Sequence, residues 1–134
     1  MLIYLLYIIL SPVLWVLLLI TSLINNKIGR HWRNQSSTIR NAKREIIQSC
    51  NNKIIILFHA ASAGEFEQLK PILRLIDRDK YFIIQSFFSP TIYEKEKNTP
   101  LADATCYHPF DFLWSALNFL KSIKPDYYII TRHD

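Results

Sequence analysis

Residues 54–65 read IIILFHAASAGE, and this stretch decides the fold. Its first five residues form an unbroken aliphatic and aromatic run, which is typical of a strand buried on both faces of a parallel sheet. The loop HAASAGE then leads into a segment with apolar residues at helical spacing, namely Phe66, Leu69, Ile72, Leu73 and Ile76. The pattern predicts a strand over 53–59 and a helix over 65–76, with a kink or an early break at Pro71.

The same alternation of strand and helix continues through the rest of the chain. Further strands are expected at 81–88, 104–107 and 127–131, separated by a short polar helix ending near Asn98 and an amphipathic helix at 112–123. This order predicts right-handed βαβ units and an open parallel sheet, that is, an α/β Rossmann-like fold. Ligands bind such sheets beyond the carboxyl ends of the strands, so the loops HAASAGE, SFFSPT, YHPFD and TRHD are expected on one rim.

Capping residues indicate where the short polar helix begins. Ser89 and Pro90 suit its cap and first-turn positions, and Thr91 with Glu94 suits a further capping pair. The helix is therefore expected to start directly after the second strand.

The first 24 residues carry no charge and form one apolar stretch. Sixteen of them are Leu, Ile or Val, which together favour membrane insertion by on the order of 5 to 10 kcal/mol. A secretory signal peptide needs a positive charge before the apolar run and a small-residue cleavage site after it, and both are missing. Because Lys27, Arg30 and Arg33 follow the run, the positive-inside rule predicts a transmembrane signal anchor over residues 1–25 with the body in the cytoplasm.

Residues 26–50 are expected to form a basic juxtamembrane helix. The residue pattern itself predicts helix over 36–49, with Ser36 or Ser37 as its cap. Its apolar stripe consists of Ile39, Ala42, Ile46 and Ile47. The cations Arg40, Lys43 and Arg44 lie mostly off that stripe. Two alternatives stay open for them: they lie on an anionic membrane surface, where each contributes about 1 kcal/mol, or they form a solvated helix face.

The charge distribution argues against nucleic acid as a partner. The formal net charge is +5, yet six of the sixteen Lys and Arg residues and none of the eleven acidic residues lie in residues 1–44. The rest of the chain is nearly neutral and offers no basic surface. Cys50 and Cys106 lack CxxC spacing, and they form no zinc-ligand pattern with the four His residues. We therefore expect free, buried thiols and no structural metal.

The loop HAASAGE holds the residues that are best suited to chemistry. Gly64 is the only glycine after residue 29, which indicates a sharp turn or a close approach to a ligand. The G-x-G-x-x-G and P-loop patterns are absent, so no dinucleotide or nucleoside triphosphate site is expected. Ser62 and Glu65 have capping-box spacing, but a carboxylate at a helix amino terminus on this rim is also suited to accept a proton from a hydroxyl. Spacing alone leaves both roles open, and His59 is equally open as a structural group or a ligand.

The ordered loops resemble one known family. HAASAGE, SPT followed by Tyr93 and Glu94, then YHPFD and KPDYYIIT, resemble the amino-terminal domain of lipid A-specific 3-deoxy-D-manno-octulosonic acid (Kdo) transferases. These enzymes add Kdo to the lipid A precursor. The apolar amino-terminal segment and its basic flank are also similar, so the resemblance covers nearly the whole chain.

The resemblance implies a GT-B glycosyltransferase of two Rossmann-like domains at the bacterial inner membrane, with its body on the cytoplasmic side. Residues 51–134 would be the acceptor-binding domain, while CMP-Kdo would bind a donor domain that is missing, and no cofactor is implied. The chain alone is therefore expected to be inactive. The Glu of the family's S-x-G-E motif is the catalytic base and corresponds to Glu65. Other acceptor contacts would come from His59, Ser62, Ala63, Gly64, Ser89, Pro90 and Thr91.

The chain departs from the family pattern in two loops. The fourth strand of the family ends in E-x-E followed by a Trp-Pro pair, whereas this chain reads TRHD. Arg132 replaces the first acidic residue, so only Asp134 corresponds to a catalytic carboxylate there. Ile92 stands where the family commonly has Gly.

Two other function classes remain open. One is a non-catalytic, membrane-tethered βαβ module from a truncated gene that binds lipid or a partner chain. The other is a soluble nucleotide-binding protein, which would require removal of the apolar terminus.

Overall fold

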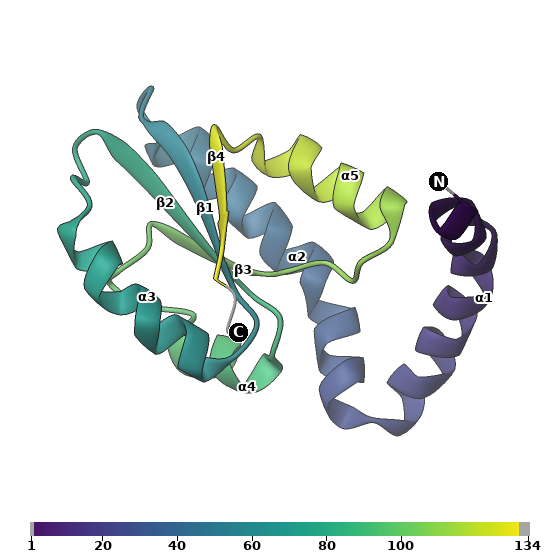
Figure 1. The fold of residues 1–134 in the computed structure, drawn as a ribbon. Coiled ribbons are helices and arrows are strands. Elements are labelled where there is room, and N and C mark those ends of the chain that lie inside the picture. The colour runs from purple at the N-terminus through teal and green to yellow at the C-terminus, as the bar shows by residue number, and fades with distance from the viewer. Residues whose placement is uncertain (1, 132–134) are drawn as a thin grey trace.

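The computed structural model describes residues 2–131, and side chains from Tyr4 to Thr131. Helices and strands alternate after two amino-terminal helices (Figure 1). The helices are α1 (Leu2–Ile24), α2 (Asn26–Ser49), α3 (Ala63–Leu75), α4 (Pro90–Glu96) and α5 (Leu113–Ile123). The strands are β1 (Ile54–Ala60), β2 (Tyr81–Phe87), β3 (Ala104–Tyr107) and β4 (Tyr127–Ile130).

The four strands form one parallel sheet in the order β3-β2-β1-β4. β1 is central and pairs with β2 from Ile54↔Tyr81 to Ala60↔Phe87. All strands therefore end at the same edge, which is where the loops predicted to bind ligand begin. The α/β parallel-sheet prediction and the four strand positions are confirmed.

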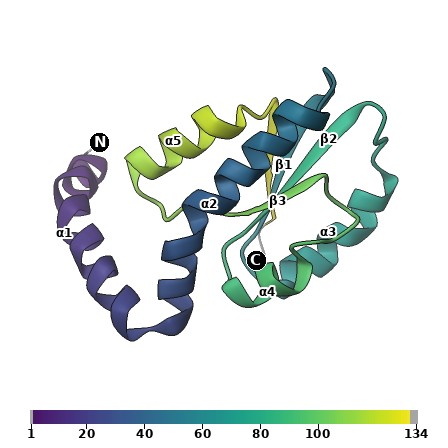
Figure 2. The ribbon, with the colours of Figure 1, turned by 180° about the vertical axis from the view of Figure 1, so that it is seen from behind.

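Two helical layers cover the two faces of this sheet (Figures 1 and 2). On one face, Ala42 of α2 and Phe119 of α5 join Leu57 of β1 in a buried cluster. On the other face, Phe66 of α3 packs with Phe58 of β1 and with α4. Successive residues of β1 thus enter opposite cores, which explains why the run IIILF has no polar member.

Helix α2 begins at Asn26, where the juxtamembrane helix expected over 26–50 begins and ten residues before the apolar pattern that predicts a helix over 36–49. Asn25 is its cap, and the Asn25 side chain accepts hydrogen bonds from the backbone N–H groups of Lys27 and Ile28. Ser37 lies inside the helix, where its hydroxyl donates to the carbonyl of Asn34 at 2.9 Å, so the cap predicted at Ser36 or Ser37 is wrong. The predicted apolar stripe packs on the sheet except for one residue, Ile47, which is exposed.

Two predictions about the other helices also need correction. α3 continues past Pro71 to Leu75, so the helix does not break early at the proline. α4 is capped at Ser89 with Pro90 in its first turn, as predicted, but the Glu94 side chain pairs with Lys97 at 2.9 Å. Glu94 therefore does not form the predicted capping pair with Thr91.

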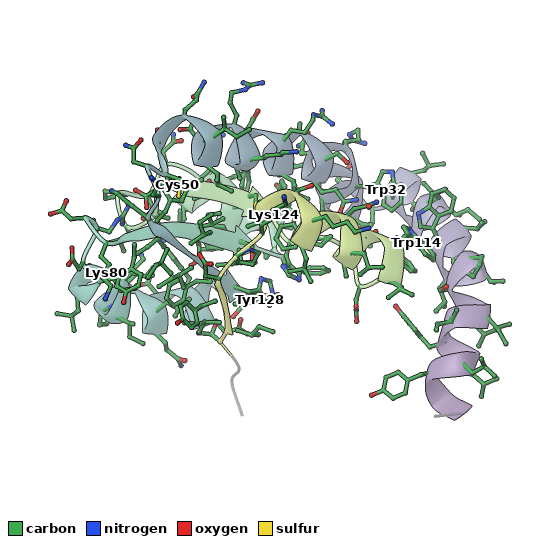
Figure 3. The ribbon with its side chains drawn as sticks, turned by 90° about the horizontal axis from the view of Figure 1, so that it is seen from above. Trp32, Cys50, Lys80, Trp114, Lys124 and Tyr128 are labelled. Atoms are coloured by element: carbon green, nitrogen blue, oxygen red, sulfur yellow. The ribbon has the colours of Figure 1, made fainter. Side chains whose placement is uncertain are left out.

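The apolar helix α1 is long enough to span a membrane by length and composition over Tyr4–Ile24, and most of its surface is exposed. It contacts the body at Trp15, whose ring centroid lies 5.7 Å from that of Trp32, and at Tyr7, whose hydroxyl contacts the backbone oxygen of Asp111. Figure 3 shows Trp32 and Trp114 on the side of the body nearest α1. Gly29 lies at the α1–α2 corner, where an added Cβ would be 2.3 Å from the Ser22 carbonyl oxygen.

The two thiols are free and buried, as predicted. Cys50 and Cys106 both lie in the cluster under α2 and α5. Complete burial raises the pKa of Cys106 to about 12, so this thiol stays protonated and unreactive at neutral pH.

Candidate functional site

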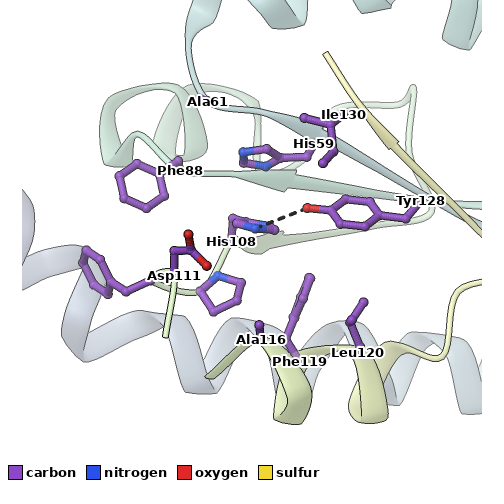
Figure 4. A pocket seen from close by; sticks show the side chains of 12 residues that line it. His59, Ala61, Phe88, His108, Asp111, Ala116, Phe119, Leu120, Tyr128 and Ile130 are labelled. Carbon is purple, nitrogen blue, oxygen red and sulfur yellow. Dashed lines mark hydrogen bonds between the residues drawn. The ribbon is translucent and has the colours of Figure 1, made fainter. Parts of the chain in front are cut away.

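A cavity of about 470 Å³ lies beyond the carboxyl ends of β1 and β4 (Figure 4). Its polar lining comes from four residues: His59 at the end of β1, His108 and Asp111 after β3, and Tyr128 of β4. Its apolar lining includes Phe88, Phe110, Phe119, Leu120 and Ile130. A concave site with a few polar groups among aromatic walls is the usual form of a small-molecule site, and this composition suits a sugar ring.

Hydrogen bonds join the polar residues of the cavity through Ser86 of β2. The Ser86 hydroxyl donates to the Phe58 carbonyl at 3.2 Å and lies 3.1 Å from Nδ1 of His59 and 3.3 Å from Nδ1 of His108. The Tyr128 hydroxyl lies 3.3 Å from Nε2 of His108. The two imidazole rings are tilted against each other with centroids 4.0 Å apart. Strand register produces this cluster, because His59 and Ser86 are paired positions of β1 and β2.

One arrangement of protons satisfies all of these contacts. In that arrangement Ser86 donates to the Phe58 carbonyl and accepts from Nδ1–H of His59 and of His108, and the Tyr128 hydroxyl donates to Nε2 of His108. Burial, followed by the nearby His59 and His31, lowers the pKa of His108 to about 3. Burial also lowers the pKa of His59, an effect that Ser86 and the Glu65 carboxylate partly offset. His59 is thus a neutral ring that keeps Nε2 as an acceptor for a bound hydroxyl.

Glu65 lies at the rim, half-buried in the first turn of α3. Its backbone N–H donates to the Ser62 hydroxyl at 3.3 Å, and its Oε2 accepts from the Ala61 N–H at 2.6 Å. In a standard capping box the Glu side chain accepts from the backbone N–H of the cap residue itself, here Ser62. Here it accepts from Ala61, the residue before the cap. Ala61 itself lines the cavity. Glu65 is not itself among the residues that line the cavity, but its carboxylate is one hydrogen bond away from Ala61, which is. The carboxylate also lies at a helix amino terminus, where a negative charge is favoured.

The structure gives Gly64 no role in a turn. Among the described residues no glycine has a positive φ, and a Cβ on Gly64 would meet nothing within 4 Å. The predicted sharp backbone turn is wrong for this residue, which leaves a close approach by a ligand. Ser62 and Ala63 are exposed beside it, in the same first turn as Glu65.

The loop after β2 lines a second, smaller pocket. Ser89 and Pro90 lie there with Phe88, while Thr91 is exposed on α4. The loop after β1 adjoins this loop, since the Phe88 N–H donates to the Ala60 carbonyl. The predicted acceptor residues thus gather on one rim, but only some of them line a pocket: His59 lines the cavity, and Ser89 and Pro90 line the smaller pocket. Ser62, Ala63, Gly64 and Thr91 line neither of the two. Asp134 and Arg132 lie outside the described residues.

One comparison with known proteins gave a match. Residues 27–134 match the family model described as 3-deoxy-D-manno-octulosonic-acid transferase (kdotransferase). The chain belongs to this family. No match was found among curated proteins or among solved structures. The match confirms the resemblance to the amino-terminal domain of the Kdo transferases and indicates a glycosyltransferase.

In this Kdo transferase domain, sequence reasoning missed three of the residues that line or organise the cavity. Ser86 lies inside the run YFIIQSF, where it resembles any buried strand residue. Tyr128 also belongs to a strand, and His108 follows β3 in the loop YHPFD without standing out from the other scattered His residues. The one available signal was the position of YHPFD on the same rim as HAASAGE. Among residues 2–131, no three His, Cys, Asp or Glu side chains are grouped to hold a metal ion.

Proposed function

We propose that this chain is the acceptor-binding part of a glycosyltransferase that moves Kdo from CMP-Kdo to the lipid A precursor. The observation that carries the proposal is the match of residues 27–134 to the kdotransferase family. The hydrogen bond from Ala61, which lines the cavity, to the Glu65 carboxylate supports it. The acceptor's sugar head would lie in the cavity against the aromatic walls. Contacts from Ser62, Ala63 and Gly64 would reach it from the α3 side, and contacts from Ser89, Pro90 and Thr91 from the α4 side.

In this proposal Glu65 is the general base. Its carboxylate takes the proton from an acceptor hydroxyl, the hydroxyl oxygen bonds to the anomeric carbon of Kdo, and the bond from that carbon to the CMP phosphate breaks. Because a sugar hydroxyl is a poor nucleophile, such a base contributes about 10² to 10⁴ in rate. The bond from the Ala61 N–H is compatible with this role, because it orients the carboxylate and uses only Oε2. His59 Nε2 would accept a second hydroxyl of the same sugar.

The donor, CMP-Kdo, would bind a separate domain, and no cofactor takes part in the step. Residues 1–134 alone are therefore expected to transfer no Kdo. A radiolabelled CMP-Kdo assay with the purified chain and lipid A precursor tests this expectation, and measurable turnover would contradict it.

We further propose that the chain is attached to the bacterial inner membrane by α1, with its body on the cytoplasmic side. The outer face of α2 supports contact with an anionic surface, because Arg40, Lys43 and Arg44 are exposed while Ala42 between them packs on the sheet. Three such cations contribute about 3 kcal/mol near anionic headgroups. Residues 25–134 should therefore bind vesicles containing anionic lipid more tightly than neutral vesicles, and equal binding would remove this part of the proposal.

A non-catalytic, membrane-tethered module is the alternative. One observation favours it: the Glu65 carboxylate already has a structural partner in the Ala61 N–H. Activity separates the two functions, since a module would bind lipid A precursor whether or not residue 65 is a base. Kdo transfer by an enzyme that carries this domain and its donor domain, with and without Glu65→Gln, distinguishes them.

A further inference from the structure

The smaller pocket at the rim differs in composition from the larger cavity, which we proposed above to hold the acceptor's sugar head. It has a volume of about 230 Å³ and lies where the start of α2 meets the loops after β2 and β3. Ile28, Phe88, Pro90 and Phe110 give it almost wholly carbon walls, and the His31 ring completes them. We call this pocket the apolar slot.

The apolar slot and the cavity are neighbours that share two walls. Phe88 and Phe110 line both, and their ring centroids lie 5.6 Å apart. Figure 4 shows Phe88 at the margin of the cavity, on the side away from Tyr128. The two pockets are therefore adjacent, and a molecule with a polar head in the cavity would pass this aromatic pair to reach the slot. Such a molecule must be an amphiphile, because one pocket offers His and Tyr groups and the other offers carbon.

The position of the slot along the chain points to a membrane lipid. Lys27, the first charged residue after the apolar segment, lies at the slot beside Ile28, and α1 ends only three residues earlier at Ile24. A helix that crosses a bilayer and ends in a cation places that cation among the headgroups. The slot would then open at the depth where acyl chains begin, and the exposed Lys27 ammonium would face an anionic headgroup.

The ring that forms the base of the slot is held rigidly. His31 is buried, with Nδ1 2.8 Å from the Phe88 carbonyl oxygen and Nε2 2.7 Å from the His108 carbonyl oxygen. Its centroid lies 4.9 Å from that of Phe88 and 4.4 Å from that of Phe110. These contacts tie α2 to both rim loops, so the slot is a preformed feature of the fold.

We propose that the apolar slot holds one acyl chain of a membrane glycolipid whose sugar head occupies the cavity. This inference rests on the proposed function, since it places the tail of the same acceptor. It adds a recognition element for the lipid part that is separate from the groups around Glu65.

Photochemical labelling of the full chain in vesicles of phosphatidylcholine and phosphatidylglycerol tests the slot. One probe is dodecyl glucoside with a diazirine in its alkyl chain, and the comparator is phosphatidylcholine with a diazirine at a similar depth. The glycoside should label Ile28, Phe88 and Phe110, whereas the phospholipid should label α1 alone. Labelling of these residues by both probes equally, or by neither, would overturn the proposal.

Two variants provide a matched pair. Ile28→Trp fills the slot and should reduce glycoside labelling of Phe88 and Phe110 by about tenfold. Ile24→Trp adds the same ring at an exposed position on α1 and should leave that labelling unchanged. If either variant fails to fold, the labelling sites in the unmodified chain still test the proposal. Equal labelling in both variants would contradict the assignment.

The outcomes separate this inference from the proposed catalysis. If the slot is not labelled while Glu65→Gln abolishes Kdo transfer by an enzyme that carries this domain with its donor domain, the slot fails alone. If the slot is labelled while that variant retains transfer, the base assignment fails alone.

Discussion

Glu65 has two roles in this account, a structural one from its hydrogen bonds and a catalytic one by proposal, and substitution can separate them. Glu65→Ala removes the acceptor for the Ala61 N–H, a bond of 2.6 Å to a carboxylate. Hydrogen bonds to charged groups contribute about 1.5–3 kcal/mol, and loss of a helix cap costs about 0.5–2 kcal/mol. Because the residue is half-buried, we expect a loss of about 1–2 kcal/mol in the free energy of unfolding.

Glu65→Gln separates the effect on stability from the effect on catalysis. The amide oxygen still accepts from the Ala61 N–H, so only the interaction of the charge with the helix dipole is lost, about 0.3–1 kcal/mol. The proton acceptor is nevertheless removed, which should lower the rate of Kdo transfer by about 10² to 10⁴ in an enzyme that carries both domains. A large loss of activity with a small loss of stability is the signature of a base.

Thr38→Val is the matched control for stability. The Thr38 hydroxyl accepts from the buried Tyr107 N–H at 3.1 Å and lies away from both rim pockets. Its removal should cost about 1–3 kcal/mol, as much as Glu65→Ala, without touching the proposed base. Urea unfolding of each variant in detergent and a CMP-Kdo transfer assay provide the two readouts. If Glu65→Gln retains normal transfer, or Thr38→Val loses as much activity as Glu65→Ala, the catalytic argument is refuted.

Three further predictions concern Gly64, Gly29 and His108. Gly64→Ala should raise the free energy of unfolding by about 0.4–1 kcal/mol, because the added Cβ meets nothing within 4 Å. The same variant should bind the acceptor more weakly in a titration. Equal binding would contradict a close approach of the ligand to Gly64. Gly29→Ala should destabilise the α1–α2 corner by about 1–3 kcal/mol, because its Cβ would lie 2.3 Å from the Ser22 carbonyl oxygen; an unchanged urea midpoint would contradict this. The folded state favours neutral His108, whose pKa is lowered to about 3, whereas the unfolded-state pKa is about 6.5. The folded state therefore keeps its full stability above about pH 6.5. It loses free energy of unfolding as the pH falls toward 3, by at most about 1.4 kcal/mol per pH unit. Urea midpoints between pH 7 and pH 4 should therefore fall less steeply in His108→Gln, and identical slopes would refute the assignment.

The sheet could be predicted from the sequence because its strands are short apolar runs bounded by clear breaks. The cap residue of α2 could not, since Ser36 and Ser37 offered a cap as good as Asn25, and only the packing of the whole helix against β3 and α5 decides between them. Propensity at a single position is a weak signal when tertiary contacts extend a helix.

The site divides in the same way. The position of Glu65 and His59 on the same rim was predictable, because the loop HAASAGE places them in one short motif after β1. The partners of His59 were not predictable. Ser86 lies 27 residues away along the chain and meets His59 only through the register of β1 and β2, and His108 follows β3, which pairs with β2. Pairings of this kind depend on the assembled sheet, which periodicity does not describe.

The contacts of α1 with the body restrict how this helix can act as an anchor. Tyr7 lies about 26 Å along the helix from Ile24, close to the full thickness of a bilayer's hydrocarbon core. If Ile24 remained at the cytoplasmic surface, the contact between Tyr7 and Asp111 would carry an acidic loop deep into hydrocarbon, at a cost of several kcal/mol. Bilayer crossing and the folded-back arrangement therefore exclude each other, and insertion must first separate α1 from Asp111 while the rim loop stays on the body.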